Sequence, residues 1–200
     1  MKTELNELLN NVQMLFATGE ITNRIERIQA EYKRSTEPEL VIQTGFGHTF
    51  SRMSLTRFEE TVQRITNDQD EDFRQYLNKL MFEKDITQAT ISRRSLIKKS
   101  ALSRYINGSR KVPSYVVFRI ALSLKLNLVE TETLLRKVGK SFKEVKMDAV
   151  VMEAIEQEIY DVIKVEAVLR HLTNGEESLF TEQEQKEFSF NDEDLEIEVI

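Results

Sequence analysis

The amino-acid sequence predicts an all-α protein, and three observations support this fold class. Apolar residues recur every three or four positions through most of the 200 residues, which is the spacing of an amphipathic helix. Helix-capping residues and glycine stops stand at the ends of these stretches. The one ambiguous stretch, Leu40 to Phe50, is short and contains glycine, and it fits a strand-like excursion or a loop.

Residues 1–66 form a predicted helical region whose role the sequence leaves open. Within residues 1–35, two apolar stripes at helical spacing are separated by a Thr-Gly-Glu break, which predicts two helices. Thr56 stands at capping-box spacing from Glu59, so we expect a further helix to begin there.

Residues 73–146 predict a compact domain of five short helices. The first is expected to begin at Phe73, and the others to span Gln88–Arg94, Lys99–Ile106, Ser114–Leu124 and Glu130–Val138. Pro113 supplies a rigid lead-in to the fourth helix, and Ser114 supplies its N-cap. We expect the second and third helices to bury a shared apolar wedge against the first and fourth. The residues of this wedge are Ile91, Ile97, Leu102 and Ile106, packed against Leu77, Leu80, Phe118 and Leu122.

Residues 147–172 are rich in apolar side chains and predict two more helices, separated between residues 160 and 164. Their hydrophobicity requires a cover, which is either the rest of the chain or a second subunit. No internal repeat is evident from the residues alone.

The net charge of -6 hides a strong asymmetry between the middle of the chain and its ends. Residues 73–146 contain 17 Lys and Arg against five acidic residues, a balance of +12, so the remainder of the chain has a balance of -18. No acidic residue lies between Asp85 and Glu130. Such a stretch favours a polyanion as partner, and the alternative is a solvated basic face.

Residues 173–200 have the opposite character. They contain ten acidic residues and one lysine with little apolar periodicity, which predicts a mostly disordered acidic tail. Two roles are open for this tail: a solvating appendage, or a mimic of DNA that covers the basic surface when no DNA is bound.

Composition excludes several classes of function. Without cysteine, the chain has no disulfide, thiolate metal site or thiol nucleophile. Its two histidines, His48 and His171, lie far apart, and neither has a second histidine at ligand spacing. No apolar run approaches the roughly 18 residues of a membrane span, and the N-terminus lacks a secretory pattern. We therefore expect a cytoplasmic protein without a metal, cofactor, membrane contact or catalytic activity.

Between Ile86 and Pro113, several residues stand at offsets typical of a DNA-binding motif. They are Thr87-Gln88, Ile97, Leu102-Ser103-Arg104, Asn107-Gly108 and Pro113. In this order and without gaps, they resemble the helix-turn-helix of the phage-repressor and Cro-like (XRE) family. The resemblance covers residues 73–139, about a third of the chain. It implies a lambda-repressor-like five-helix domain, here flanked by N-terminal helices, C-terminal helices and the acidic tail.

The candidate DNA-binding residues follow from this placement. They are Thr87, Gln88, Lys98, Lys99, Ser100, Ser103, Arg104, Arg110 and Lys111. Thr87 is placed to cap its helix, which leaves Gln88 and the helix N-terminus to bind a phosphate. Five of these candidates lie on the first turns of the recognition helix: Lys98, Lys99, Ser100, Ser103 and Arg104. The N-terminal part of such a helix reaches base edges or phosphates in the major groove. Arg110 and Lys111 are expected to clamp the DNA backbone.

Two positions depart from the family pattern. Leu96 stands where the family has glycine in the turn, so it either adopts a left-handed conformation or the turn is remodelled. Lys98 replaces a capping serine, which weakens the start of the recognition helix by about 1 kcal/mol.

The function that the sequence favours is a sequence-specific transcriptional regulator, a repressor that binds double-stranded DNA at an inverted repeat as a homodimer. Residues 147–172 and the N-terminal helices are the candidate dimer interface. The alternative is an antitoxin, or an adaptor of a phage or mobile element, in which residues 1–65 bind a protein partner and the helix-turn-helix only autoregulates. A third interpretation, an enzyme delivered to DNA, finds no catalytic motif in the sequence.

Overall fold

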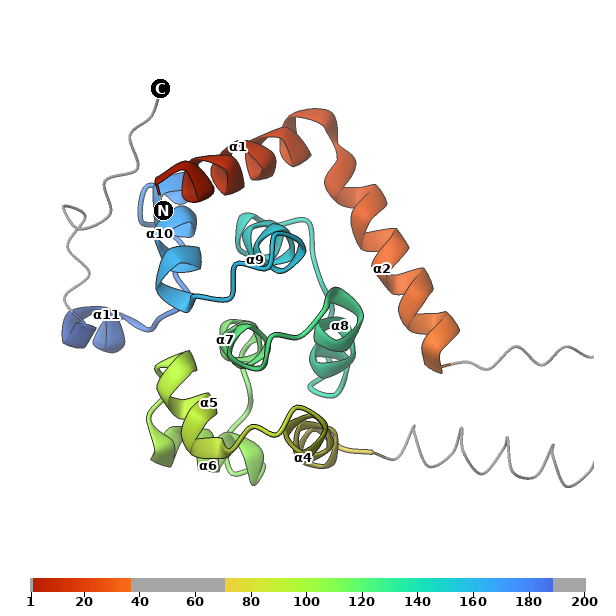
Figure 1. The fold of residues 1–200 in the computed structure, drawn as a ribbon, viewed down its shortest axis with the longest axis vertical. Helices are drawn as coiled ribbons and strands as arrows, with labels where there is room; N and C mark the ends of the chain where they lie inside the picture. The colour runs from red at the N-terminus through yellow and green to blue at the C-terminus, as the bar shows by residue number, and fades with distance from the viewer. Residues whose placement is uncertain (1, 37–70, 189–200) are drawn as a thin grey trace, which may run out of the picture.

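The computed structural model describes residues 2–36 and 71–188, and every regular element among them is an α-helix (Figure 1). The all-α prediction is therefore confirmed for the described part of the chain. α7 (Ser114–Leu124) lies at the centre of the arrangement, and its residues from Val116 to Leu124 are all buried. A helix that is buried on every side is stable only when other helices surround it. None of the described helices is long and apolar enough to span a bilayer.

Five helices occupy the segment predicted to form a compact domain. They are α4 (Phe73–Glu83), α5 (Gln88–Ser95), α6 (Lys99–Ile106), α7 and α8 (Leu128–Arg136). The eight predicted wedge residues are all buried, with exposed fractions between 0 and 4 %. The predicted core of this segment is therefore confirmed.

Two predicted helix starts need correction. Pro113, rather than Ser114, occupies the N-cap of α7 and makes no side-chain capping bond. α8 begins at Leu128 rather than at Glu130, because Asn127 and Glu130 form a capping box. In this box the Glu130 amide donates to Asn127 Oδ1, and the Asn127 amide donates to Glu130 Oε2, each at 2.8 Å.

The two N-terminal helices cover the C-terminal pair. α1 (Lys2–Thr18) packs on α9 (Lys146–Glu156) and α10 (Val162–Thr173), whereas α2 (Glu20–Thr36) packs on α8. Figure 1 shows α1 and α2 joined at a corner, following two sides of the bundle. The corner is Gly19, whose φ of +72° confirms the predicted break.

This packing corrects the argument for a dimer interface at residues 147–172. Leu8 and Val12 of α1 are completely buried, as are Val150 and Val151 of α9. Ion pairs across the contact join Arg24 to two glutamates of α9, and Lys164 to Glu4. The cover that these apolar residues require is therefore the rest of the same chain, so their hydrophobicity does not indicate a second subunit.

The helix pairs α7–α8 and α9–α10 repeat one backbone plan that was not evident from the residues alone. Lys125 and Glu158 end the first helix of each pair in the left-handed conformation, with φ of 53° and 58°. In each turn, the following amide donates to a carbonyl five residues earlier. These bonds are Leu126 N to Ala121 O, at 3.0 Å, and Ile159 N to Ala154 O, at 2.8 Å.

The second helix of each pair also repeats its polar contacts. Each begins at a capping side chain, Asn127 in α8 and Asp161 in α10. Five residues later each has a fully buried glutamate, Glu132 or Glu166, that accepts an amide from the segment after the helix. The donors are Phe142 N, 2.9 Å from Glu132 Oε2, and Leu179 N, 2.7 Å from Glu166 Oε2.

The predicted acidic tail is in part folded. Leu179 and Phe180 are buried, and Ser178 donates its hydroxyl to Glu166. A short helix, α11 (Glu182–Phe188), follows. The prediction of disorder was wrong for residues 173–188, because two apolar side chains and a buried carboxylate fix a segment whose charge suggested solvation. Residues 189–200 and the helix predicted from Thr56 lie outside the described residues.

Candidate nucleic-acid interface

A three-residue turn, Leu96 to Lys98, joins α5 to α6. Leu96 adopts φ 57° and ψ 19°, so the left-handed alternative predicted for this turn holds. A non-glycine residue pays roughly 1–2 kcal/mol for this conformation. Hydrogen bonds hold the turn in place: Ser92 Oγ donates to Ile97 O at 2.6 Å, and Ile97 N donates to Ser95 Oγ at 3.3 Å.

The starts of α5 and α6 match their predictions. Thr87 Oγ1 accepts the Thr90 amide at 3.2 Å and caps α5. Lys98 occupies the N-cap of α6 and makes no capping bond, which leaves the first amides of α6 without that side-chain acceptor.

The side chains of α6 divide into two faces. Leu102, Tyr105 and Ile106 are buried against the neighbouring helices. The opposite face exposes four of the nine candidate DNA-binding residues: Lys99, Ser100, Ser103 and Arg104. The other five, Thr87, Gln88, Lys98, Arg110 and Lys111, are exposed as well. The structure therefore brings all nine to the surface on and beside α5 and α6.

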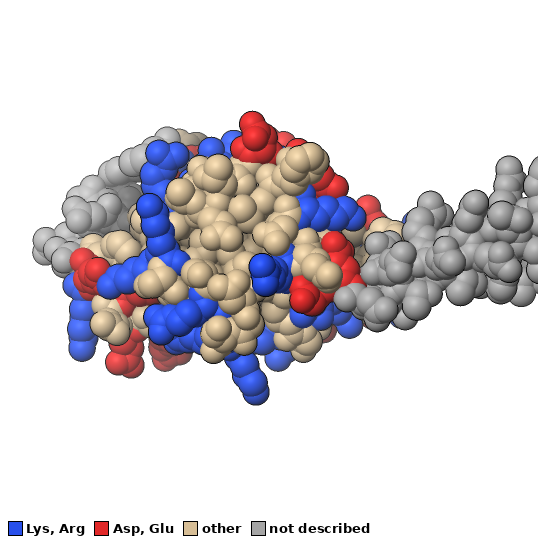
Figure 2. Space-filling model, turned by 90° about the horizontal axis from the view of Figure 1, so that it is seen from below, with Lys and Arg blue, Asp and Glu red and all other residues tan. Residues whose placement is uncertain are grey.

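Figure 2 shows the side of the molecule where α4, α5 and α6 lie, with Lys and Arg spread over it and most acidic side chains towards its margins. Next to the C-terminal end of α6, this part of the protein has a groove of about 800 Å³. The cationic side chains that line it are Arg74, Arg110, Lys111, Lys137 and Lys140. Arg110 lies over the Tyr105 ring, 5.2 Å from its centroid, which orients the guanidinium at the groove.

Arg119 is not available to a polyanion, although it belongs to the basic stretch between Asp85 and Glu130 that was expected to bind one. The structure buries it completely at the centre of α7. Its Nε donates to Ser95 O at 2.8 Å, and its Nη1 lies 3.0 Å from Glu184 Oε2 of α11. The guanidinium also lies over the Phe180 ring, 4.2 Å from the centroid. Arg119 therefore joins α5, α7 and the C-terminal segment and does not face solvent.

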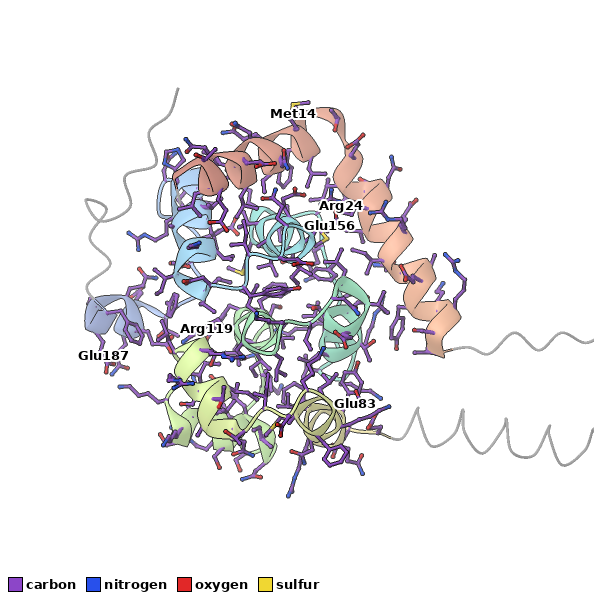
Figure 3. All side chains as sticks on the ribbon, viewed as in Figure 1. Met14, Arg24, Glu83, Arg119, Glu156 and Glu187 are labelled. Carbon is purple, nitrogen blue, oxygen red and sulfur yellow. The ribbon has the colours of Figure 1, made fainter. Side chains whose placement is uncertain are left out.

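α11 lies beside α6, which is the placement required by the second role left open for the acidic tail, that of a cover on the basic surface. Lys98 Nζ and Glu187 Oε2 are 2.7 Å apart, with side chains that are 58 % and 47 % exposed. Figure 3 labels Arg119 on α7 and Glu187 on α11, on the side of the molecule where α11 sits next to α5 and α6. A groove of about 610 Å³ runs between the helices, lined by Lys98, Arg104 and Arg110 on one side and by Glu182, Glu184 and Glu187 on the other.

Electrostatics favour the charged form of the glutamate that anchors α11. Burial opposes ionisation of Glu184, but hydrogen bonds from Arg119 and Thr181 outweigh it and lower the pKa of this carboxyl. Glu184 is therefore a carboxylate at neutral pH. The only advance signal of this contact was the high density of acidic residues after residue 173.

Among the described residues, no group of three or more histidine, aspartate or glutamate side chains is arranged to hold a metal ion. No protein-family model matches the chain, and no curated protein or solved structure shows significant similarity to it.

Proposed function

We propose that this protein is a sequence-specific DNA-binding regulator that places α6 in the major groove. One observation carries the proposal: the outward face of α6 exposes Lys99, Ser100, Ser103 and Arg104, while its other face is buried. Lysine and arginine can bond to guanine O6 and N7, and serine accepts several base partners. The order of the five helices from α4 to α8, with a short turn between α5 and α6, is the one that the phage-repressor resemblance implies.

Two surfaces beside α6 suit the DNA backbone. The exposed N-terminus of α5, with Gln88 next to the Thr87 cap, presents amides and a positive helix dipole to a phosphate. On the other side, Arg110 and Lys111 line the basic groove together with Arg74 and Lys140. Contacts of this kind add affinity and fix register without selecting a sequence.

Binding as a homodimer to an inverted repeat, in the cytoplasm and as a repressor, is part of the proposal. Half-sites would then lie about 34 Å apart, one turn of the double helix. Since α1 of the same chain covers α9 and α10, the apolar residues buried beneath α1 cannot supply the dimer contact. One candidate for the dimer contact is Phe82 of α4. Its exposed fraction, 88 %, is the largest among the exposed large apolar side chains of the described residues.

The test is binding to the DNA upstream of the protein's own gene compared with random DNA, over a salt series. The Lys99→Ala, Arg104→Ala double variant is expected to lose the preference for the upstream DNA, because each base contact contributes about 1–3 kcal/mol of discrimination. Fluorescence anisotropy with labelled duplexes measures both affinities.

The matched control is Lys33→Ala with Arg34→Ala. Lys33 and Arg34 lie at exposed positions of α2, a helix that packs on α8. Their substitution also removes two positive charges. The control should keep the preference of the unmodified protein. Equal and steeply salt-dependent binding to both DNAs would contradict base recognition and leave only a non-specific electrostatic attraction.

The antitoxin or adaptor function is a second candidate, and one observation favours it. Met14 and Phe16 of α1 are exposed, at 59 % and 38 %, although Leu8, Leu9, Val12 and Leu15 of the same helix are buried within the chain. These two side chains offer a partner protein a small apolar contact on the helix that covers α9 and α10.

A further inference from the structure

We propose that α11 is an internal competitor of DNA: its glutamates occupy the position of a backbone phosphate at the start of α6. This inference rests on the proposed DNA-binding function. It assigns to residues 182–188 a regulatory role at the same surface, and it chooses between the two roles that the sequence left open for the acidic tail.

The first observation is the ion pair between Lys98 and Glu187, at 2.7 Å. Lys98 is the residue at the N-cap of α6, where the helix amides lack a side-chain acceptor and an anion is favoured. A carboxylate at this place provides the charge that a DNA phosphate would provide. One cation cannot hold both partners at full strength, so each must weaken the binding of the other.

The second observation is that the overlap extends beyond one ion pair. The groove between α6 and α11 has Arg104 and Arg110 in one wall and Glu182 in the other. Three of the nine candidate DNA-binding residues therefore line a groove whose second wall is acidic. A DNA strand entering this groove would meet like charge from α11, and this repulsion lowers affinity for as long as the distal end of α11 stays in the groove.

The third observation is the unequal strength of the two ends of α11. Its first turn is anchored by Glu184, which accepts from the fully buried Arg119, and by Phe180, which is also buried. Its last turn is held by the Lys98 ion pair, between two side chains that are each about half exposed, and by an edge-to-face contact of Phe188 with Phe180 at 5.7 Å between ring centroids. Exposed ion pairs contribute little and are screened by salt, and the Phe188 ring is itself exposed, so the distal end of α11 is held more weakly than the proximal end and can leave while that end stays in place.

The experiment measures DNA affinity for Glu187→Gln, with Glu176→Gln as the matched control. Glu176 is exposed in the same C-terminal segment, so its substitution removes one negative charge without touching the groove. We expect Glu187→Gln to bind the upstream DNA about two- to fivefold more tightly than the control does, a factor that corresponds to one exposed ion pair. The gain should shrink as salt increases, because screening weakens the Lys98 pair in the unmodified protein.

A second readout follows α11 directly. The chain has no cysteine, so Lys186→Cys introduces a single site for a nitroxide label on the exposed side of α11. The label should be restricted in the free protein and gain mobility when specific DNA is added.

The outcomes separate this inference from the proposed function. If the unmodified protein binds DNA specifically but Glu187→Gln equals the control, or the label stays restricted in the complex, α11 does not compete and the inference is overturned. If neither the unmodified protein nor Glu187→Gln shows any preference for the upstream DNA, the proposed function fails and the competition fails with it.

Discussion

The helix pairs α7–α8 and α9–α10 each have a left-handed residue after the first helix, a capping side chain and a buried glutamate, although the α9–α10 connection is longer, and they differ at the centre of the first helix. Six residues before the left-handed turn residue, α7 has Arg119 and α9 has Met152, and both are completely buried. The arginine connects its helix pair to α5 and α11 through hydrogen bonds, whereas the methionine offers only apolar contact. The same backbone arrangement thus surrounds a hydrogen-bonded arginine in the first helix pair and a methionine with only apolar contacts in the second.

The largest effect is expected when the first helix pair is made like the second, with Arg119→Met. Glu184 then loses its cation, and the buried Ser95 carbonyl loses its donor. Removing one partner of a buried ion pair costs about 3–5 kcal/mol, which urea unfolding would measure as a lower free energy of unfolding. Arg119→Met combined with Glu184→Met should recover much of this loss, because no charge is left unpaired. A loss below about 1 kcal/mol in the single variant would mean that this junction is not a strong constraint.

An intermediate and pH-dependent effect is expected at Asp148 of α9, which occupies the position of Tyr115 in α7. Burial raises the pKa of Asp148 to about 6, against a weaker lowering effect of the hydrogen bond from the Lys143 amide. The folded state therefore holds this proton more tightly than the unfolded state. The contribution of Asp148 to stability is highest below about pH 4, falls as the pH rises towards about 6, and stays constant above that.

Asp148→Asn tests this behaviour, since the amide oxygen can still accept the Lys143 amide. The free energy of unfolding of the unmodified protein, relative to the variant, should fall by about 3 kcal/mol between pH 3 and pH 7, as expected for a shift of roughly two pKa units. Denaturant titrations at several pH values give the two curves. A constant difference between them would show that the Asp148 carboxyl titrates normally.

The smallest effect concerns the two corresponding glutamates. Glu132 pairs with Arg136 of its own helix at 2.7 Å, so a neutral glutamine there loses an ion pair. Burial raises the pKa of Glu166, so ionising this carboxyl is harder in the folded protein than in water. At neutral pH, Glu132→Gln should therefore destabilise the protein by about 1 kcal/mol more than Glu166→Gln does. Thermal or urea unfolding of the two variants side by side decides the order.

The same comparison shows what the sequence can predict. Helix periods, the Thr87 cap and the apolar wedge around Ile91 depend on neighbours within a few turns, and these predictions were confirmed. The repeat escaped notice because its copies share capping chemistry and burial and have few identical residues. The burial of Arg119 was not predicted for a related reason. Its partner Glu184 lies 65 residues away, and no local pattern distinguishes a buried arginine from an exposed one.

For the candidate site, too, the features set by nearby residues were predicted, and the contact between distant residues was not assigned. All nine candidate residues are exposed as a surface site requires, and their contact with DNA stays a prediction. The α11 contact at Lys98 depends on a chain reversal after Phe180 that brings an acidic helix back to α6. Charge density alone left two roles open for that segment, solvation and cover of the basic surface, because it does not show that the buried Leu179 and Phe180 fix the chain nearby.

The packing of α1 on α9 and α10 has a consequence for how this chain is made. Asn11 and its partner Glu153 are 142 residues apart, so the ribosome must add most of the protein after α1 has emerged. At cellular rates of synthesis, this delay lasts roughly 7–30 s. During that time Leu8 and Val12 have no native surface to pack on. α1 is thus among the last helices to reach its native contacts. Until then its apolar residues, such as Leu8 and Val12, are exposed and can be bound by a chaperone at the ribosome exit.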